Sequence, residues 1–178
     1  QIVDDLGGMD RFTWLSTAYL LSSTALVPIY GKLADVYPKK NMAIASVTLF
    51  VIGSLLCGVA GMVDLSFWSI DRMMQLMIAR FMQGVGGAGL FTMAFVIIAN
   101  MFPPAERGKY QGYTGAVFAA SSILGPTLGG LLSDYGNDII PGISGWRYIF
   151  LINIPLGALI LYQLNKRIPS FPTKSNDV

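Results

Sequence analysis

Five long apolar runs occupy most of this chain, and each is about long enough to cross a lipid bilayer. A helix needs roughly 20 apolar residues to span the hydrocarbon core. The runs cover residues 14–34, 41–63, 73–102, 110–133 and 147–165. Each is predicted to be a transmembrane helix. The expected fold class is therefore an all-α membrane protein.

Composition supports this class. Hydrophobic residues make up 53% of the chain, charged residues 12%, and histidine is absent, which is more apolar surface than a soluble core can use. The first twelve residues are polar and acidic and lack a basic segment or cleavage site, so no signal peptide is visible. The single cysteine, Cys57, has no partner for an internal disulfide and is expected to serve packing.

The distribution of basic residues predicts the orientation, because short cytoplasmic loops collect lysine and arginine. When alternate loops are grouped, eight of the twelve basic residues lie on one side: Lys32, Lys39, Lys40, Arg107, Lys109, Lys166, Arg167 and Lys174. The other side holds Arg11, Arg72 and Arg147. The N-terminal tail is thus predicted to lie outside and the C-terminal tail in the cytoplasm. Aromatic residues near the outer ends fit an interfacial belt: Trp14, Trp68, Trp146 and Tyr148.

Arg80 is the only charged residue between Arg72 and Glu106. An arginine in hydrocarbon costs at least about 2.5 to 3.5 kcal/mol, so a membrane helix carries one where it faces a cavity or a polar partner. Arg80 shares a helical face with Gln83, Gly84 and Gly87, and these three are predicted to face the same cavity. The alternative is snorkelling, since Arg80 lies about 10 Å inside the outer end of its run at 1.5 Å per residue.

The segment from Gly84 to Gly89 matches the G-x-G-x-x-G pattern of dinucleotide-binding proteins. That pattern requires a preceding strand, a βαβ unit and an acidic residue about twenty positions later, and the sequence predicts none of these. The glycines therefore indicate tight helix packing.

The loop after the first run carries a candidate cytoplasmic gate, which comprises Gly31, Asp35, Lys39 and Lys40. Gly31 and Asp35 lie one helical turn apart, so a site of close approach and a carboxylate share a face. The carboxylate could bond to the N-terminus of a neighbouring helix and latch two helices on one side. An ordinary basic loop with a solvated aspartate is the alternative.

The fourth run combines residues that favour helix bending: Gly112, Ser121, Gly125, Pro126 and Gly129. Pro126 has no N–H, so the carbonyl of Ser122 loses its helical partner and the helix can kink. Gly125 and Gly129 form a small-xxx-small face for close crossing by another helix. A hinge or gate is predicted here, with simple packing as the alternative.

Together these motifs resemble the major facilitator superfamily. Gly31 to Lys40 is similar to its loop motif between helices 2 and 3, Arg80 to Ala88 to its helix 4 motif, and Gly112 to Gly130 to its helix 5 antiporter motif. Two further segments, Trp14 to Leu20 and Trp146 to Gly157, look most like the drug:proton antiporter-2 branch, whose members usually have fourteen spans. The chain departs from the usual motifs at Val36, Pro38 and Ser121.

The resemblance implies that residues 1–178 are a partial N-terminal transporter bundle containing helices 2 to 6, with helix 1 and the C-terminal half absent. Substrate would bind near the midplane between two halves, so the missing half is needed for a complete pathway. The implied function is proton-coupled export of small amphipathic or cationic compounds across the plasma membrane, with Arg80 in proton coupling. An importer of the same superfamily and a truncated, non-transporting fragment are the alternatives.

The expected partners are a small-molecule substrate, protons and the lipid bilayer, without nucleic acid. No cofactor, metal or enzymatic activity is expected, because the sequence has no histidine, no metal-ligand spacing and no nucleophile with a base. The outer loop around Asp64 to Arg72, with Phe67 and Trp68, is predicted to form a short amphipathic turn on the outer surface.

Overall fold

The computed structural model describes residues 1–62, 70–138 and 142–168. Within these ranges the chain is helical and contains no strand, which confirms the all-α class. Trp68, Lys174 and most of the predicted outer amphipathic turn, including Phe67, lie outside the described residues.

Among the described residues, five helical segments are long and apolar enough to cross a membrane: Met9–Val36, Lys39–Val59, Arg72–Met101, Pro104–Tyr135 and Gly145–Arg167. The first comprises a short 3-10 turn and α2 (Phe12–Val36), and the next three are α3 (Lys39–Val59), α4 (Arg72–Met101) and α5 (Pro104–Tyr135). The last comprises η4 (Gly145–Arg147), α6 (Tyr148–Leu151) and α7 (Asn153–Arg167). A short N-terminal helix, α1 (Ile2–Leu6), precedes them.

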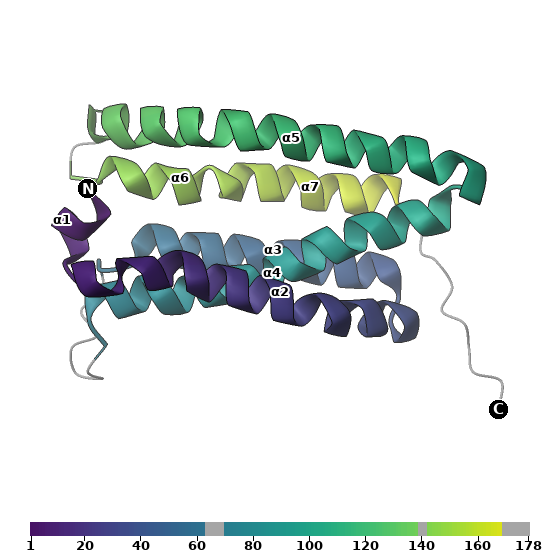
Figure 1. The fold of residues 1–178 in the computed structure, drawn as a ribbon, viewed down its shortest axis with the longest axis horizontal. Helices are drawn as coiled ribbons and strands as arrows, with labels where there is room; N and C mark the ends of the chain where they lie inside the picture. The colour runs from purple at the N-terminus through teal and green to yellow at the C-terminus, as the bar shows by residue number, and fades with distance from the viewer. Residues whose placement is uncertain (63–69, 139–141, 169–178) are drawn as a thin grey trace.

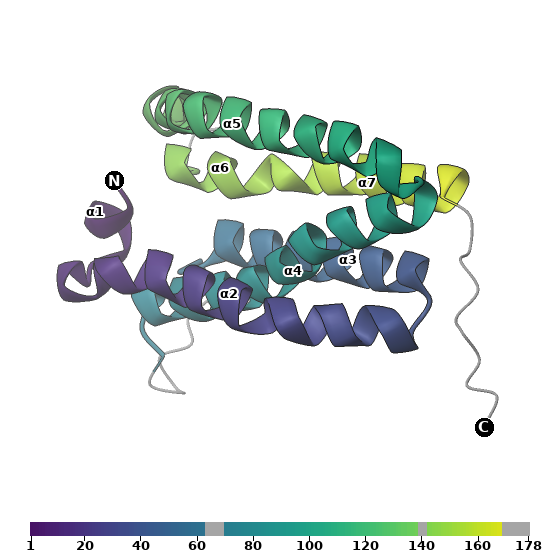
Figure 2. The same cartoon turned by 45° about the vertical axis from the view of Figure 1, so that its right-hand side comes forward.

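The helices form two groups. Helices α2, α3 and α4 pack together, while α5 lies alongside α6 and α7 on the other side of the bundle (Figures 1 and 2). The chain crosses between the groups where α4 turns into α5 at Pro103. At this turn the rings of Phe102 and Tyr110 stack with their centroids 3.6 Å apart, and Arg107 Nε donates to the Phe102 carbonyl at 3.1 Å.

The helices depart from the apolar runs most clearly at two helix ends and at one internal break. Helix α3 ends at Val59, because Gly61 adopts a φ of 77° and turns the chain. Helix α5 begins at Pro104, six residues before its apolar run, since proline is favoured in the first helical turn and charged residues continue the helix beyond the apolar part. The fifth run is divided at Ile152, where Pro155 has no N–H to bond the carbonyl of Leu151.

Glycines of α3 and α4 allow these two helices to approach each other closely. A Cβ added at Gly53 would lie 2.6 Å from Gln83 Cα, and one added at Gly86 would overlap the backbone of Phe50. Backbone atoms cannot change rotamer to avoid such an overlap, as a side chain can. The glycine-rich segment thus lies within a helix and serves tight packing, as the sequence predicted.

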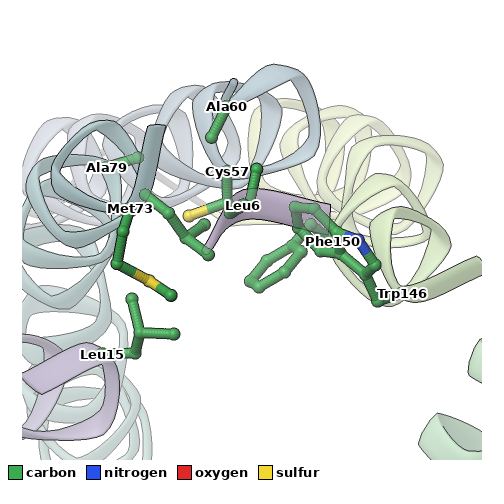
Figure 3. Packing of buried hydrophobic residues seen from close by; sticks show 9 residues of the cluster. Leu6, Leu15, Cys57, Ala60, Met73, Ala79, Trp146 and Phe150 are labelled. Atoms are coloured by element: carbon green, nitrogen blue, oxygen red, sulfur yellow. The ribbon is translucent and has the colours of Figure 1, made fainter. Parts of the chain in front are cut away.

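The main apolar core lies near the ends of α2, α3, α4 and α6 that α1 covers. Figure 3 shows its side chains converging from these helices, with Leu6 reaching in from α1. Cys57 is fully buried there and fills the packing role expected of it. The cluster comprises Leu6, Leu15, Cys57, Ala60, Met73, Leu76, Ala79, Trp146 and Phe150.

Candidate functional site

Arg80 lies on α4, eight residues after Arg72 begins the helix, or about 12 Å along it at 1.5 Å per residue. Its Nη1 donates to Gln83 Oε1 at 3.3 Å, and its guanidinium carbon lies 4.5 Å from the centroid of the Phe150 ring. The Nε atom is buried and has no hydrogen-bond partner among the described residues.

None of the ion pairs in the described ranges involves Arg80. A guanidinium keeps its proton even when it is partly desolvated. Among the described residues, its charge is therefore met by one amide oxygen, Gln83 Oε1, and by the face of the Phe150 ring. Arg80 is thus a half-buried cation without a carboxylate partner in the described part of the chain.

Gln83 connects Arg80 to a second helix. The side chain of Gln83 is buried, and because an arginine can only donate, its amide must present Oε1 to Arg80. The amide nitrogen then faces α3 and donates to Ser54 Oγ at 2.6 Å. Ser54 Oγ also accepts from Asn153 Nδ2 at 3.1 Å, so the polar chain reaches α7. The thiol of Cys57 contacts Gln83 Oε1 at 3.8 Å.

Gly84 and Gly87 lie against α2. A Cβ added at Gly84 would lie 2.6 Å from the Tyr19 carbonyl oxygen and would also meet Ser22, and one added at Gly87 would lie 2.8 Å from Tyr19 Oη. In this structure Gln83 is buried against α3 and Gly84 packs against α2, and their cavity-facing role stays a prediction. The spacing that places them on one face with Arg80 also places them where α2 and α3 pack.

The predicted cytoplasmic gate residues flank the turn between α2 and α3, with Gly31 and Asp35 near the end of α2 and Lys39 and Lys40 at the start of α3. Lys40 Nζ donates to the Asn165 carbonyl at 2.9 Å, in the last turn of α7, where the helix dipole favours a cation. Asp35 is exposed. The side chains of Asp35 and Lys39 form no hydrogen bond or ion pair within the described part of the chain. The predicted bond from Asp35 to a helix N-terminus is therefore not made here; the contact that does form uses Lys40 and a helix C-terminus. Gly31 has open space where a side chain would project.

The predicted bending residues lie on α5, which has no buried residue. A Cβ added at Gly112, Gly125 or Gly129 would meet no atom within 4 Å, so the small-xxx-small face has no neighbouring helix in the described ranges. The helix continues through Pro126 as far as Tyr135. Hydroxyl groups near Pro126 form hydrogen bonds within the helix. Ser122 Oγ, for example, donates to the Phe118 carbonyl at 2.9 Å.

Ser121 lines an apolar groove of about 420 Å³ between α4 and α5. Three aromatic rings and two hydroxyl groups contribute to its walls, so it offers apolar surface with few polar contacts. Its lining residues are Phe91, Phe95, Thr114, Gly115, Val117, Phe118 and Ser121.

The sequence interpretation missed a polar cluster around Arg147. This arginine is 4% exposed, and its Nη1 donates to the carbonyls of Gly58 at 2.9 Å and Ala60 at 2.7 Å. These carbonyls belong to the end of α3, where helical partners run out. Arg147 Nη2 contacts Asp5 Oδ2 at 3.3 Å, and its guanidinium carbon lies 4.4 Å from the centroid of the Trp146 ring.

Asp5 also accepts hydrogen bonds from Ser144 Oγ at 2.7 Å and Trp146 Nε1 at 3.1 Å. Burial alone would raise the pKa of the Asp5 carboxyl. The hydrogen bonds from Ser144 and Trp146 and the charge of Arg147 outweigh burial and hold that pKa below its ordinary value. The only signal in the sequence was an arginine beside a tryptophan in a loop otherwise poor in basic residues.

Comparison with known proteins identifies the family. The family model described as Major Facilitator Superfamily matches residues 1–176. The chain is 44% identical over 162 residues to "Multidrug resistance protein 3" of Bacillus subtilis, covering 91% of this chain and 28% of that protein. It is 38% identical over 159 residues to "Multidrug transporter protein MdtP" of the same species, covering 89% and 26% respectively.

A fungal relative, "MFS-type efflux pump LUC4" from a Fusarium species, is 34% identical over 163 residues, covering 92% of this chain and 26% of that protein. The chain thus spans roughly a quarter of the length of these relatives. The family match, together with five helices long enough to cross a bilayer, shows an integral membrane protein. The chain belongs to the Major Facilitator Superfamily.

Proposed function

We propose that the protein containing this chain is a proton-coupled exporter of small amphipathic or cationic compounds in the plasma membrane. The names of three relatives, which refer to multidrug resistance, multidrug transport and efflux, support export. Residues 1–178 contribute a partial N-terminal bundle with the N-terminal tail outside and the C-terminal tail in the cytoplasm. The missing half completes the pathway.

The observation that carries the proposal is the half-buried cation of Arg80. A fixed positive charge lowers the pKa of a carboxyl group near it, so that the group releases its proton more readily. In the described helices the acidic residues lie near the helix ends, as Asp35, Glu106 and Asp134 do, and Arg80 has no acidic partner. The proton-carrying acid therefore belongs to a part of the protein outside this chain.

Substrate would bind where the two halves meet, as in transporters that alternate between inward and outward states. The groove between α4 and α5 offers aromatic rings for an apolar body and the hydroxyls of Thr114 and Ser121 for polar groups. Gly31, Asp35, Lys39 and Lys40 would control the cytoplasmic side. The residues that would allow α5 to bend during exchange are Gly112, Ser121, Gly125, Pro126 and Gly129.

Asp35 suits the gating role because it is exposed and without a partner in the described residues. Its carboxylate is free to bond with a helix end of the other half in one state and to release it in the other. The proposal requires transport and gating only, with no cofactor, metal or chemical catalysis.

Transport by the full-length protein in liposomes tests the proposal, with ethidium as a cationic probe. Under the proposal, an acidic interior drives ethidium into the vesicles in exchange for protons, and nigericin, which collapses the gradient, stops the uptake. If an acidic exterior drives the uptake instead, the protein is a proton-coupled importer. Uptake that does not respond to either gradient would exclude proton coupling.

A further inference from the structure

A polar chain crosses three helices behind Arg80. It runs from Arg80 to Gln83 on α4, then to Ser54 on α3, and ends at Asn153 at the start of α7. Ser54 is fully buried and Gln83 is 3% exposed, so water does not compete for the hydrogen bond between these two side chains.

Each acceptor in this chain is shared by two donors. Gln83 Oε1 accepts from Arg80 and lies 3.8 Å from the Cys57 thiol, while Ser54 Oγ accepts from the amides of Gln83 and Asn153. Removal of the Ser54 hydroxyl would leave two amide N–H groups without an acceptor. The orientation of Gln83, which presents its oxygen to Arg80, depends on that hydroxyl.

The segment formed by α6 and α7 contacts both ends of the chain. Phe150 lies under the guanidinium of Arg80, and Asn153, three residues later, bonds to Ser54. These two residues flank the break at Ile152. A displacement of this segment would therefore disturb the ring beneath Arg80 and the amide behind Gln83 together.

We propose that Ser54, Phe150 and Asn153 are positioning residues that hold the Arg80 guanidinium inside the bundle. This inference rests on the proposed role of Arg80 in proton coupling. An arginine has a long flexible stem, and in a membrane its competing conformation is snorkelling toward the interface. The outer end of α4 is about 12 Å away, so a partly released side chain would turn toward it. The polar chain and the aromatic ring oppose that movement.

Apart from Gln83, few of the described side chains face Arg80. The titratable groups that face it are the thiol of Cys57 on α3 and the phenol of Tyr19 on α2. The α6 and α7 segment presents Phe150 directly and Asn153 through Ser54 and Gln83. No charged side chain of the described residues pairs with Arg80 and could hold it in place of the polar chain.

The test measures the pH dependence of ethidium transport by the full-length protein in liposomes. In Ser54→Ala and Asn153→Leu, the pH of half-maximal transport should rise by about 1 unit, because an acid that loses a nearby cation binds its proton more tightly. Phe150→Leu keeps an apolar side chain but removes the ring, and should shift the midpoint in the same direction. Asn153→Gln retains the amide and should restore part of the shift.

Ser46→Ala is the matched control. Ser46 is a fully buried serine on the same helix as Ser54, but its hydroxyl donates to the Met42 carbonyl of its own helix at 2.7 Å. The midpoint of this variant should equal that of the wild type. The thiol of Cys57 gives a second readout independent of transport, in a protein whose other cysteines have been replaced. N-ethylmaleimide should label Cys57 faster in Ser54→Ala than in Ser46→Ala.

Arg80→Ala separates the two claims. If Arg80→Ala shifts or abolishes the pH response while Ser54→Ala, Asn153→Leu and Phe150→Leu keep the wild-type midpoint, the positioning role is wrong and the proposed function stands. If Arg80→Ala itself keeps the wild-type pH response, the proposed function fails first. If one positioning variant does not fold, the midpoints of the other two decide the result.

Discussion

The Asp5 carboxylate of α1 and the Arg147 guanidinium of η4 form an ion pair at 3.3 Å, although 142 positions separate them in the chain. The same guanidinium closes the end of α3 by donating to the carbonyls of Gly58 and Ala60. One side chain thus joins the N-terminal segment, the end of α3 and the start of the last helical segment. A movement of helices at this end of the bundle must either break these contacts or move the three segments together.

Acid should loosen this contact. The pKa of Asp5 lies below its ordinary value in the folded protein, so the carboxylate stabilises the fold above the ordinary aspartate range, and this contribution is lost as the pH falls through the lowered pKa. Hydrogen exchange of residues 2–6 should therefore quicken, after correction for the intrinsic rate, as the pH falls below about 4. In Asp5→Asn, exchange should be fast at every pH. Corrected exchange that is independent of pH in the wild type would contradict this account.

Arg147→Met should destabilise the protein by on the order of 3 kcal/mol, because it removes the buried partner of a carboxylate and leaves two helix-end carbonyls without donors. Thermal unfolding in detergent micelles gives the measurement. The control is Arg11→Met, since Arg11 pairs with Asp10 and Asp71 at an exposed position. An exposed pair contributes about 0 to 1 kcal/mol, so equal losses in the two variants would contradict the structural role of Arg147.

Substitution by alanine should affect stability differently at two glycines. Gly86→Ala should destabilise by about 1 to 3 kcal/mol, because its methyl group would overlap the Phe50 backbone and force α3 and α4 apart. Gly108→Ala, at a helical site with open space, should leave stability unchanged or raise it by up to about 1 kcal/mol. Unfolding midpoints of the two variants provide the comparison. If both behave alike, the close α3–α4 contact is wrong.

Five helices long and apolar enough to cross a bilayer could be predicted from the sequence, because a bilayer sets a minimum apolar length that is visible without knowledge of tertiary contacts. The glycine-rich part of α4 was likewise interpretable, since close helix packing needs small residues wherever the partner lies. The ends were harder to predict. The end of α3 depends on a positive φ at Gly61, and the start of α5 extends into charged residues that a hydrophobicity pattern treats as loop.

Contacts between side chains far apart in the chain could not be predicted from the sequence. Ser54 and Asn153 lie 99 positions apart and appear in apolar runs as ordinary small or polar residues. Arg147 was counted among loop cations, but the unsatisfied carbonyls at the end of α3 hold it in the interior. The packing of Gln83 on α3 and of Gly84 on α2 could not be predicted either, because a shared helical face does not tell which neighbouring helix covers it.

The proposed hinge on α5 predicts a separation of stability from turnover. Gly125→Leu should leave the unfolding temperature of residues 1–178 unchanged, because a Cβ added there would meet no described atom of another helix within 4 Å. In the full-length protein it should slow exchange between inward and outward states more than it weakens substrate binding. Equilibrium binding of ethidium and the rate of transport make the comparison. If affinity collapses while exchange keeps its rate, α5 lines the binding site instead.

The proposed orientation can be tested with single cysteines. Position 39 is the first residue of α3. Position 134 lies near the end of α5, at the opposite end of the bundle, where Asp134 is exposed. An impermeant maleimide added to intact cells should label Asp134→Cys and spare Lys39→Cys. After the cells are opened, both positions should react. Labelling of position 39 alone in intact cells would reverse the orientation.

The central claim is that the charge of Arg80 couples transport to protons, and the most direct measurement is ethidium transport by full-length Arg80→Ala under an imposed pH gradient. Gradient-driven transport should fall at least about tenfold, equivalent to about 1.4 kcal/mol, while the folded protein is produced normally. Arg80→Lys should lose most of its activity as well, since lysine lacks the planar donor fork and loses its proton more readily when buried. Arg11→Ala should transport as the wild type does. Wild-type coupling in Arg80→Ala would contradict the account.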